Sequence, residues 1–158
     1  MGKIAVHEFI SLDGVVEDPR WTADYPFDPK MGEAIGAITL ASQAILLGRR
    51  TYEMFAPAWS ARTAEEDPGA PFFNDTPKYV VSATLQRADW NNSEIVGPYD
   101  AETIRTLKDR PDGDLYVSGS VSLVRRCSPI TLSMSSTCSS TRSSSAPGCD
   151  SSGTAARR

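Results

Sequence analysis

Short apolar runs, separated by polar stretches and turn residues, recur along the first 126 residues of the chain. Runs rich in β-branched and apolar residues, bounded by Gly, Pro, Asp or Ser, are typical of strands. They predict strands at 3–10, 44–48, 78–82, 93–97 and 114–120. The run at 44–48, AILLG, is wholly apolar, which favours a strand covered on both faces.

Helices are expected where helix-start residues precede an amphipathic stretch. Asp28 as the N-cap and Pro29 at the first position predict a helix that runs to about Ser42. Its apolar face would consist of Met31, Ile35, Ile38 and Leu40. Further helices are expected at 48–55, at 100–109 behind the N-cap Asp100, and from residue 121 onward.

The segments between these elements have the composition of loops. Residues 11–27 are polar and contain Gly14, Pro19 and Pro26, and residues 56–76 contain three prolines. The resulting order of strands and helices, β-α-β-α-β-β-α-β-α, predicts an α/β fold with a central, mostly parallel sheet covered by helices. A length of 158 residues fits one domain with a sizeable core.

The composition changes abruptly after Arg126. Residues 127–158 contain eleven serines, one acidic residue, Asp150, no aromatic residue, and all three cysteines of the chain. The cysteines lack the closely spaced Cys or His partners that a zinc site needs. We therefore divide the chain into a folded domain, 1–126, and a Ser/Cys-rich low-complexity tail, 127–158, that we expect to be disordered.

Charge and hydropathy argue against several classes of partner. The formal net charge is −4 at pH 7, which disfavours a general nucleic-acid binder or a binder of anionic membranes. No stretch approaches the roughly 18 apolar residues of a membrane span, and the N-terminus lacks a signal-peptide pattern. We expect a cytoplasmic protein with a small-molecule substrate, no nucleic-acid or membrane partner, no metal and no disulfide framework.

Two strand-to-helix junctions have the form of a nucleotide site. In AILLGRRTYE, the strand ends at Gly48 and a helix begins with Arg49, Arg50 and Thr51. Free N–H groups and the dipole at a helix N-terminus favour a phosphate, and arginine adds charge-assisted hydrogen bonds. In LYVSGSVSLV, Gly119 follows a strand in the same way, so the two junctions could hold one pyrophosphate between them. Each glycine alone is also compatible with a simple turn, and the arginines with a solvated helix start.

Other candidate residues have a structural interpretation beside a functional one. Asp13, which precedes Gly14, is either a turn residue or a carboxylate that orients a substrate or relays a proton. His7, alone inside the first strand, is interpreted as a packed core residue. Trp21, with Tyr25 and Phe27, would either line a substrate pocket or anchor the loop.

Four motifs in order resemble a known family: FISLDGVVEDP, ILLGRRTYEMF, FFNDTPKYVVSATL and DLYVSGSVSLVR. They resemble the dihydrofolate-reductase-like superfamily, in particular the reductase domain at the C-terminal end of bifunctional riboflavin-biosynthesis deaminase-reductases, in its stand-alone bacterial type. The resemblance covers about residues 3–126, and the zinc-binding deaminase half is absent. It implies a three-layer α/β fold with a mostly parallel sheet flanked by helices, with the terminal strands missing here. The intact family also allows a homodimer.

The resemblance implies NADPH as the cofactor. The residues at cofactor-binding positions of the family are Gly48, Arg49, Arg50, Thr51, Ser82, Thr84, Gly119, Ser120 and Val121. Of these, the G-R-x-T segment binds the phosphates, and an arginine there also suits the 2′-phosphate of NADPH. Ser82 lies near the adenosine end in the family, and the turn at Gly119 lies along the pyrophosphate.

The resemblance also implies a reaction. The S-L-D-G motif flanks nicotinamide and substrate in the family, which gives Ser11, Asp13, Gly14 and Trp21 as substrate-binding residues and Asp13 as the catalytic residue. The implied activity is hydride transfer from NADPH to a pterin-, aminopyrimidine- or carbonyl-type molecule, as in 5-amino-6-(5-phosphoribosylamino)uracil reductases. The alternative is a non-catalytic nucleotide-binding chain or a truncated pseudoenzyme.

The genetic code offers an explanation for the tail. If each new codon takes the last base of one codon and the first two of the next, a TCN serine codon becomes NTC, which encodes Phe, Leu, Ile or Val. The residues after Arg126 can then be re-read as a helix end, a strand, a Pro-containing link and a Gly turn, as the family's ending should be. We hypothesise a frameshift near residues 125–127; the alternative is a genuine Ser-rich regulatory or interaction tail.

Overall fold

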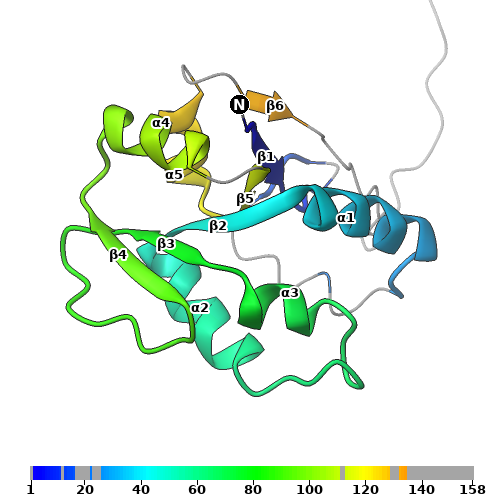
Figure 1. The fold of residues 1–158 in the computed structure, drawn as a ribbon. Coiled ribbons are helices and arrows are strands. Elements are labelled where there is room, and N and C mark those ends of the chain that lie inside the picture. Colours follow the sequence, from blue (N-terminus) through cyan, green and yellow to red (C-terminus); the bar gives the residue numbers. More distant parts are fainter. Residues whose placement is uncertain are drawn as a thin grey trace, which may run out of the picture.

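The fold is built on one parallel sheet. The computed structural model describes residues 2–11, 13–16, 22, 26–110, 113–128 and 132–134. Within them six strands form the sheet in the order β4-β3-β2-β5-β1-β6 (Figure 1). The strands are β1 (Ile4–His7), β2 (Ser42–Gly48), β3 (Lys78–Val81), β4 (Ser93–Gly97), β5 (Asp114–Ser118) and β6 (Leu132–Met134). The helices are α1 (Pro29–Ala41), α2 (Arg49–Trp59), α3 (Ala70–Asp75), α4 (Ala101–Asp109) and α5 (Val121–Cys127).

Helices cover both faces of the sheet, which confirms the predicted layered α/β fold. Because side chains alternate along a strand, the central strands contribute to two separate cores. On one face Leu46 and Val117 pack with residues of α4 and α5, such as Ile104. On the other, Leu47 and Tyr116 pack with aromatic residues of α2 and α3. Figure 1 shows α4 and α5 on one side of the sheet and α2 and α3 on the other.

Helix α1 begins as predicted but is less buried than expected. The Asp28 carboxylate accepts the Lys30 N–H at 2.8 Å, and Pro29 occupies the first turn. Ile38 packs against the core on the α2 and α3 side, whereas Leu40 is 84% exposed. The assignment of Leu40 to the apolar face was therefore wrong, because residues two apart on a helix point in nearly opposite directions.

The predicted loop over residues 56–76 was also wrong in part. Helix α2 continues through Pro57 to Trp59, and α3 forms within the supposed loop. Pro71 lies in the first turn of α3, where a missing N–H removes no intrahelical hydrogen bond. Trp59 stacks on Phe73 with ring centroids 4.1 Å apart, so the two helices hold each other against the sheet.

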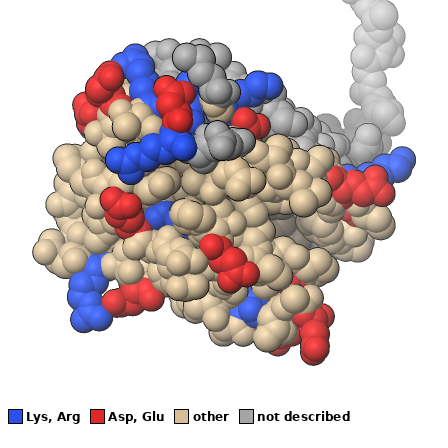
Figure 2. Space-filling view, viewed as in Figure 1, with Lys and Arg blue, Asp and Glu red and all other residues tan. Residues whose placement is uncertain are grey.

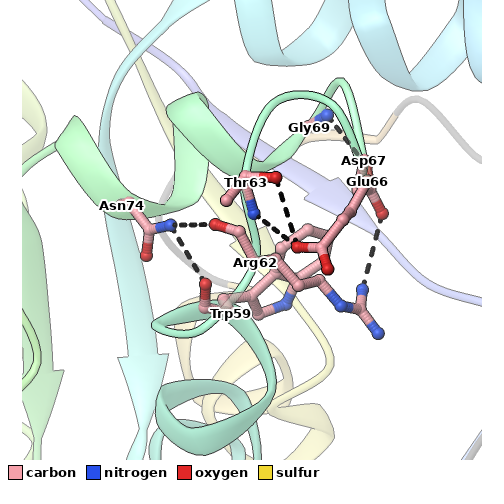
Figure 3. Close-up of polar contacts among 7 residues, drawn as sticks. All are labelled: Trp59, Arg62, Thr63, Glu66, Asp67, Gly69 and Asn74. Carbon is pink, nitrogen blue, oxygen red and sulfur yellow. Dashed lines mark hydrogen bonds and ion pairs between the residues drawn. The ribbon is translucent and has the colours of Figure 1, made fainter.

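Side chains cap the backbone between α2 and α3 (Figure 3). Glu66 accepts the Thr63 N–H at 2.9 Å, and Asp67 accepts the Gly69 N–H at 2.8 Å. The Asn74 amide donates to the carbonyl of Trp59 at 3.0 Å. Asn74 also accepts the indole N–H of Trp90 at 2.9 Å, so one side chain joins α3, the end of α2 and the segment before β4.

A buried lysine holds the start of β3 in place through hydrogen bonds to backbone carbonyls. The Lys78 side chain is inaccessible to solvent, and its Nζ donates to the backbone carbonyls of Asn74, Thr76 and Asn91 at 3.2, 2.8 and 2.8 Å. Nζ also lies 4.6 Å from the centre of the Trp90 ring. Burial lowers the pKa of Lys78 to about 8. With every donor of the ammonium used, its role is structural.

The folded part extends past the predicted boundary at Arg126. Cys127 is the last residue of α5, is 1% exposed and belongs to the core on the α4 side. Burial raises the pKa of its thiol to about 11, so this cysteine is an inert apolar residue. Strand β6 lies within the tail and pairs with β1, which corrects the expectation of disorder at 132–134. The rest of the tail lies outside the described residues.

Among the helices that the structure describes, none is long and apolar enough to cross a membrane. On the face seen in Figure 2, acidic and basic side chains are interspersed.

Candidate functional site

The predicted site residues converge on one edge of the sheet. Ser82 follows β3, Gly48 ends β2, Gly119 follows β5, and the segment from Ser11 to Gly14 comes after β1. Strands β3, β2, β5 and β1 are neighbours in that order and run parallel, so their carboxyl ends share an edge. This edge is where α/β sheets bind ligands.

Hydrogen bonds join the two predicted phosphate junctions. The Gly48 N–H donates to the Ser120 hydroxyl at 2.9 Å, across the ends of β2 and β5. The Ser120 N–H in turn donates to the Thr51 hydroxyl at 3.0 Å, and the two hydroxyls lie 2.9 Å apart. Thr51 is only 4% exposed. The two turns therefore form one unit, which we call the double turn (Gly48–Thr51 and Gly119–Ser120).

The double turn requires a glycine at position 119. Gly119 has a φ of +62°, in the left-handed region that side chains disfavour. A Cβ built there would lie 3.2 Å from Cγ2 of Thr51. Ser120, the next residue, is also left-handed at a φ of 57°. The backbone thus takes an uncommon conformation where β5 ends, and Thr51 packs tightly against it.

The N-terminus of α2 is open to a ligand. Gly48 is the N-cap and provides no side-chain cap, so the first backbone N–H groups of this 11-residue helix keep their capacity for an anion. Arg49 pairs with Glu53 at 3.1 Å on the surface. Arg50 is exposed and, within the described part of the chain, makes no hydrogen bond or ion pair. The chemistry of this donor set fits a phosphate.

Ser82 shapes the end of β3 from a buried position. Its hydroxyl oxygen accepts the N–H groups of Thr84 and Leu85 at 3.1 and 2.9 Å, and its own N–H donates to the Gly97 carbonyl at 2.8 Å. Thr84 is exposed beside it. The assignment of Ser82 and Thr84 to a bound adenosine stays a prediction.

Ser11, Asp13 and Gly14 belong to a turn in which Asp13 is fully exposed. The Ser11 hydroxyl donates to the Asp13 carboxylate and lowers its pKa, so Asp13 is ionised at neutral pH. Gly14, at a φ of +89°, donates its N–H to the Ser11 carbonyl. This geometry matches the turn interpretation and leaves Asp13 available as a base or an orienting group. Trp21 lies outside the described residues.

His7 is a core residue, as interpreted. It is 4% exposed, and its Nδ1 lies 2.9 Å from the Tyr116 hydroxyl. Burial lowers the pKa of His7 to about 4, so the ring is neutral at physiological pH. Phe27 is 58% exposed, and its role in a pocket wall stays a prediction.

Glu8 is the residue that sequence reasoning passed over. It is the first residue after β1, at the same edge as the double turn. Its Oε1 is buried and, among the described residues, has no hydrogen-bond partner. Burial raises the pKa of this carboxyl to about 8, and the Gly119 N–H acts in the opposite direction. An acidic residue inside the predicted strand 3–10 was the available signal.

Two further features of the described residues concern the surroundings of this site. The described residues contain no group of three or more His, Cys, Asp and Glu side chains placed to hold a metal ion. A cavity of about 670 Å³ borders Lys78 and Ser93, the first residues of β3 and β4. It therefore lies at the amino ends of the strands, opposite the candidate site.

Comparison with known protein families gives one match. A family model described as the RibD C-terminal domain matches residues 2–128 of the chain. A comparison with curated proteins found no significant match.

Solved structures share the fold. A protein from Shewanella sp. PV-4 assigned to riboflavin biosynthesis has a TM-score of 0.56 at 20% identity, over 75% of this chain and 66% of that one. Dihydrofolate reductase from Enterococcus faecalis, complexed with NADP(H) and RAB-propyl, has a TM-score of 0.51 at 15% identity, over 81% and 65%. Schistosoma mansoni dihydrofolate reductase has a TM-score of 0.50 at 15% identity, over 83% of this chain and 68% of that one. The chain thus spans about two thirds of the length of each.

Proposed function

Because the chain belongs to the RibD C-terminal domain family, we propose that it is an NADPH-dependent reductase of the riboflavin-biosynthesis and dihydrofolate-reductase type. Its substrate would be a small molecule with a C=N or C=O bond, of pterin, aminopyrimidine or carbonyl type. The observation that supports this most directly is the double turn. Two strand-to-helix junctions on neighbouring strands are hydrogen-bonded into one unit beside an open helix N-terminus.

Each part of the edge has a role in this proposal. The backbone N–H groups of α2 and the exposed Arg50 guanidinium would hold phosphates, including the 2′-phosphate. Gly119 would keep the double turn in the conformation that presents these groups, since its φ of +62° disfavours a side chain and a Cβ there would meet Thr51. NADPH, when bound, supplies a hydride, and the protein positions the acceptor and excludes water.

The substrate side of the site would lie beyond β1. The turn from Ser11 to Gly14 follows that strand, and its ionised Asp13 could accept a hydrogen bond from a substrate amine or hydroxyl. The riboflavin branch of the family suggests 5-amino-6-(5-phosphoribosylamino)uracil as the first substrate to test. We expect a soluble cytoplasmic enzyme that acts on small molecules.

A non-catalytic nucleotide-binding chain is the second candidate. It is favoured by one observation: the family match ends at residue 128, where the composition changes to the Ser/Cys-rich segment. A measurement of turnover distinguishes the reductase from the non-catalytic chain. Binding of NADPH without oxidation, across pterin, aminopyrimidine and carbonyl substrates, would favour the second candidate.

The Arg50→Gln variant tests the cofactor assignment. Loss of one charge-assisted contact to the 2′-phosphate should weaken NADPH binding about tenfold while NADH binding changes less than twofold. Affinity is measured by quenching of tryptophan fluorescence. Arg105→Gln removes a similar exposed arginine from α4 and serves as the control. Equal affinity of the wild type for NADPH and NADH, or no binding of either, would contradict the assignment.

A further inference from the structure

Glu8 lies where the reacting end of a bound cofactor would be. The ends of β3, β2, β5 and β1 follow one another along the edge. If the adenosine end is at β3 and the phosphates are at the double turn of β2 and β5, the next strand end is that of β1. His7 pairs with Ser118 in the parallel register, so Glu8 and Gly119 are the next residues on neighbouring strands.

We propose that Glu8 is the proton donor of the reduction, an inference that rests on the proposed reductase function. Its buried Oε1 has no partner among the described residues, although buried polar atoms are nearly always paired. A substrate nitrogen or oxygen at this edge would supply the missing partner. Glu8 is half-buried as a residue, so part of it is exposed although Oε1 itself is not.

The surroundings keep Glu8 protonated. Burial raises its pKa to about 8 against the opposing effect of the Gly119 N–H. The titratable neighbours, His7 on β1 and Tyr116 on β5, are both neutral at that pH, because burial lowers the pKa of the first and raises that of the second. Asp13, in the turn that follows, is ionised. The two carboxyls near the end of β1 therefore differ in protonation state, the pattern that assigns acid and base roles.

The proton completes the chemistry of hydride transfer from NADPH. When a hydride forms a new C–H bond at the acceptor carbon, the π electrons of its C=N or C=O bond move to the nitrogen or oxygen. That atom then takes the proton of the Glu8 carboxyl: the Glu8 O–H bond breaks and an N–H or O–H bond forms. NADP⁺ and a Glu8 carboxylate remain, and water from the edge returns the proton to Glu8.

The first measurement records the titration of the Glu8 carboxyl itself. Glutamate side chains are labelled with ¹³C, and their titration is recorded by NMR in the wild type, in Glu8→Gln and in Glu33→Gln. Glu33 is exposed on α1, so its variant makes the same chemical change away from the edge. One glutamate should titrate near pH 8 in the wild type and in Glu33→Gln and be missing in Glu8→Gln. Titration of every glutamate below about pH 6 would overturn the proposal.

The same titration in the presence of nucleotide tests whether Glu8 lies beside the nicotinamide ring. NADP⁺ carries a positive nicotinamide ring and NADPH a neutral one, so a ring beside Glu8 should give a lower pKa with NADP⁺ than with NADPH. Equal values in two saturated samples would overturn the proposal. If wild type and Glu33→Gln bind neither nucleotide, the proposed function fails, and Glu8 has no proton to donate to a reduction.

Turnover supplies the third readout, with 5-amino-6-(5-phosphoribosylamino)uracil and 7,8-dihydrofolate as probe substrates. In the wild type, kcat/KM should fall about tenfold per pH unit above about pH 8, because only the protonated acid donates. Glu8→Gln, which resembles the neutral acid and should fold, should lose about 10²–10³-fold in kcat/KM and this pH dependence. Unchanged turnover in Glu8→Gln would overturn the proposal and leave the reductase function standing. If neither probe substrate is turned over, the comparison of the Glu8 pKa with NADP⁺ and with NADPH decides whether the proposal holds.

Discussion

At the scale of single residues, the site depends on close approach between a few side chains and the backbone. Gly119 and Thr51 show this most clearly, because a single added methyl group at position 119 would meet the Thr51 side chain. Their packing sets the position of the second turn. We therefore expect the residues of the double turn to act on cofactor binding through backbone geometry as well as through direct contact.

Gly119→Ala should destabilise the protein by about 1–3 kcal/mol and weaken NADPH binding at least tenfold. The reason is the left-handed φ of +62° combined with a Cβ contact of 3.2 Å to Thr51. Denaturant unfolding and fluorescence titration measure the two effects. Gly36→Ala is the matched control: it lies within α1 with open space around its Cβ, and should be neutral or stabilise by up to about 1 kcal/mol. Equal behaviour of the two variants would contradict the role of Gly119.

At the scale of elements, the sequence predicts the strands of the sheet better than the elements that pack outside them. The apolar runs located five strands, and Asp28 and Asp100 located two helix starts, because strand composition and N-caps are local signals. Helix α3 was missed because prolines were taken as loop residues. Its stability comes from stacking of Phe73 on Trp59 and from hydrogen bonds to Asn74, which are long-range contacts that local composition does not carry.

Asn74→Ala should destabilise the protein by about 2–3 kcal/mol. The change leaves the indole N–H of Trp90 without its partner and removes the amide hydrogen bonds to the carbonyls of Trp59 and Arg62. Chemical denaturation measures the loss, and near-ultraviolet circular dichroism reports the change around Trp90. Asn91→Ala removes an exposed amide whose single hydrogen bond is 3.4 Å long, and should cost less than about 0.5 kcal/mol. A similar loss in both variants would show that Asn74 does not join these elements.

The candidate site was predictable to the extent that its motifs follow strand ends. Parallel strands bring those ends together, so Gly48 and Gly119 were expected to lie close to each other. Their connection through the hydroxyls of Thr51 and Ser120 was not predictable, because it depends on the left-handed backbone at 119 and 120. Glu8 was missed because its raised pKa comes from burial, which composition does not show.

At the scale of the whole molecule, the question is what completes the sheet beside β1. The outermost strand on that side of the sheet is β6, a strand of three residues within the Ser/Cys-rich segment. The match to the family model ends at residue 128, close to the change in composition. The frameshift hypothesis predicts that an apolar sequence belongs there.

A frame-corrected chain should therefore be more stable than the chain as written by about 2–5 kcal/mol, the range for several restored core side chains. It should also bind NADPH more tightly, since an apolar strand in place of the three-residue β6 would support β1 and the turn after it more firmly. Unfolding curves and fluorescence titration of the two chains measured side by side provide the comparison. Resequencing several independent clones supplies the control. An uninterrupted frame for the Ser/Cys tail in all of them, or no gain in the corrected chain, would refute the hypothesis.

The position of β1 in the sheet has a consequence for how the protein is made. Ile4, near the start of the chain, pairs with Leu115 on one side and with Leu132 on the other. During synthesis β1 thus leaves the ribosome before either of the strands with which it pairs. Strands β2, β3 and β4 can associate earlier, whereas β1 waits with its apolar side chains exposed until β5 emerges. We therefore expect the insertion of β1 beside β5 to be the slow step of folding and the interval in which a chaperone would matter most.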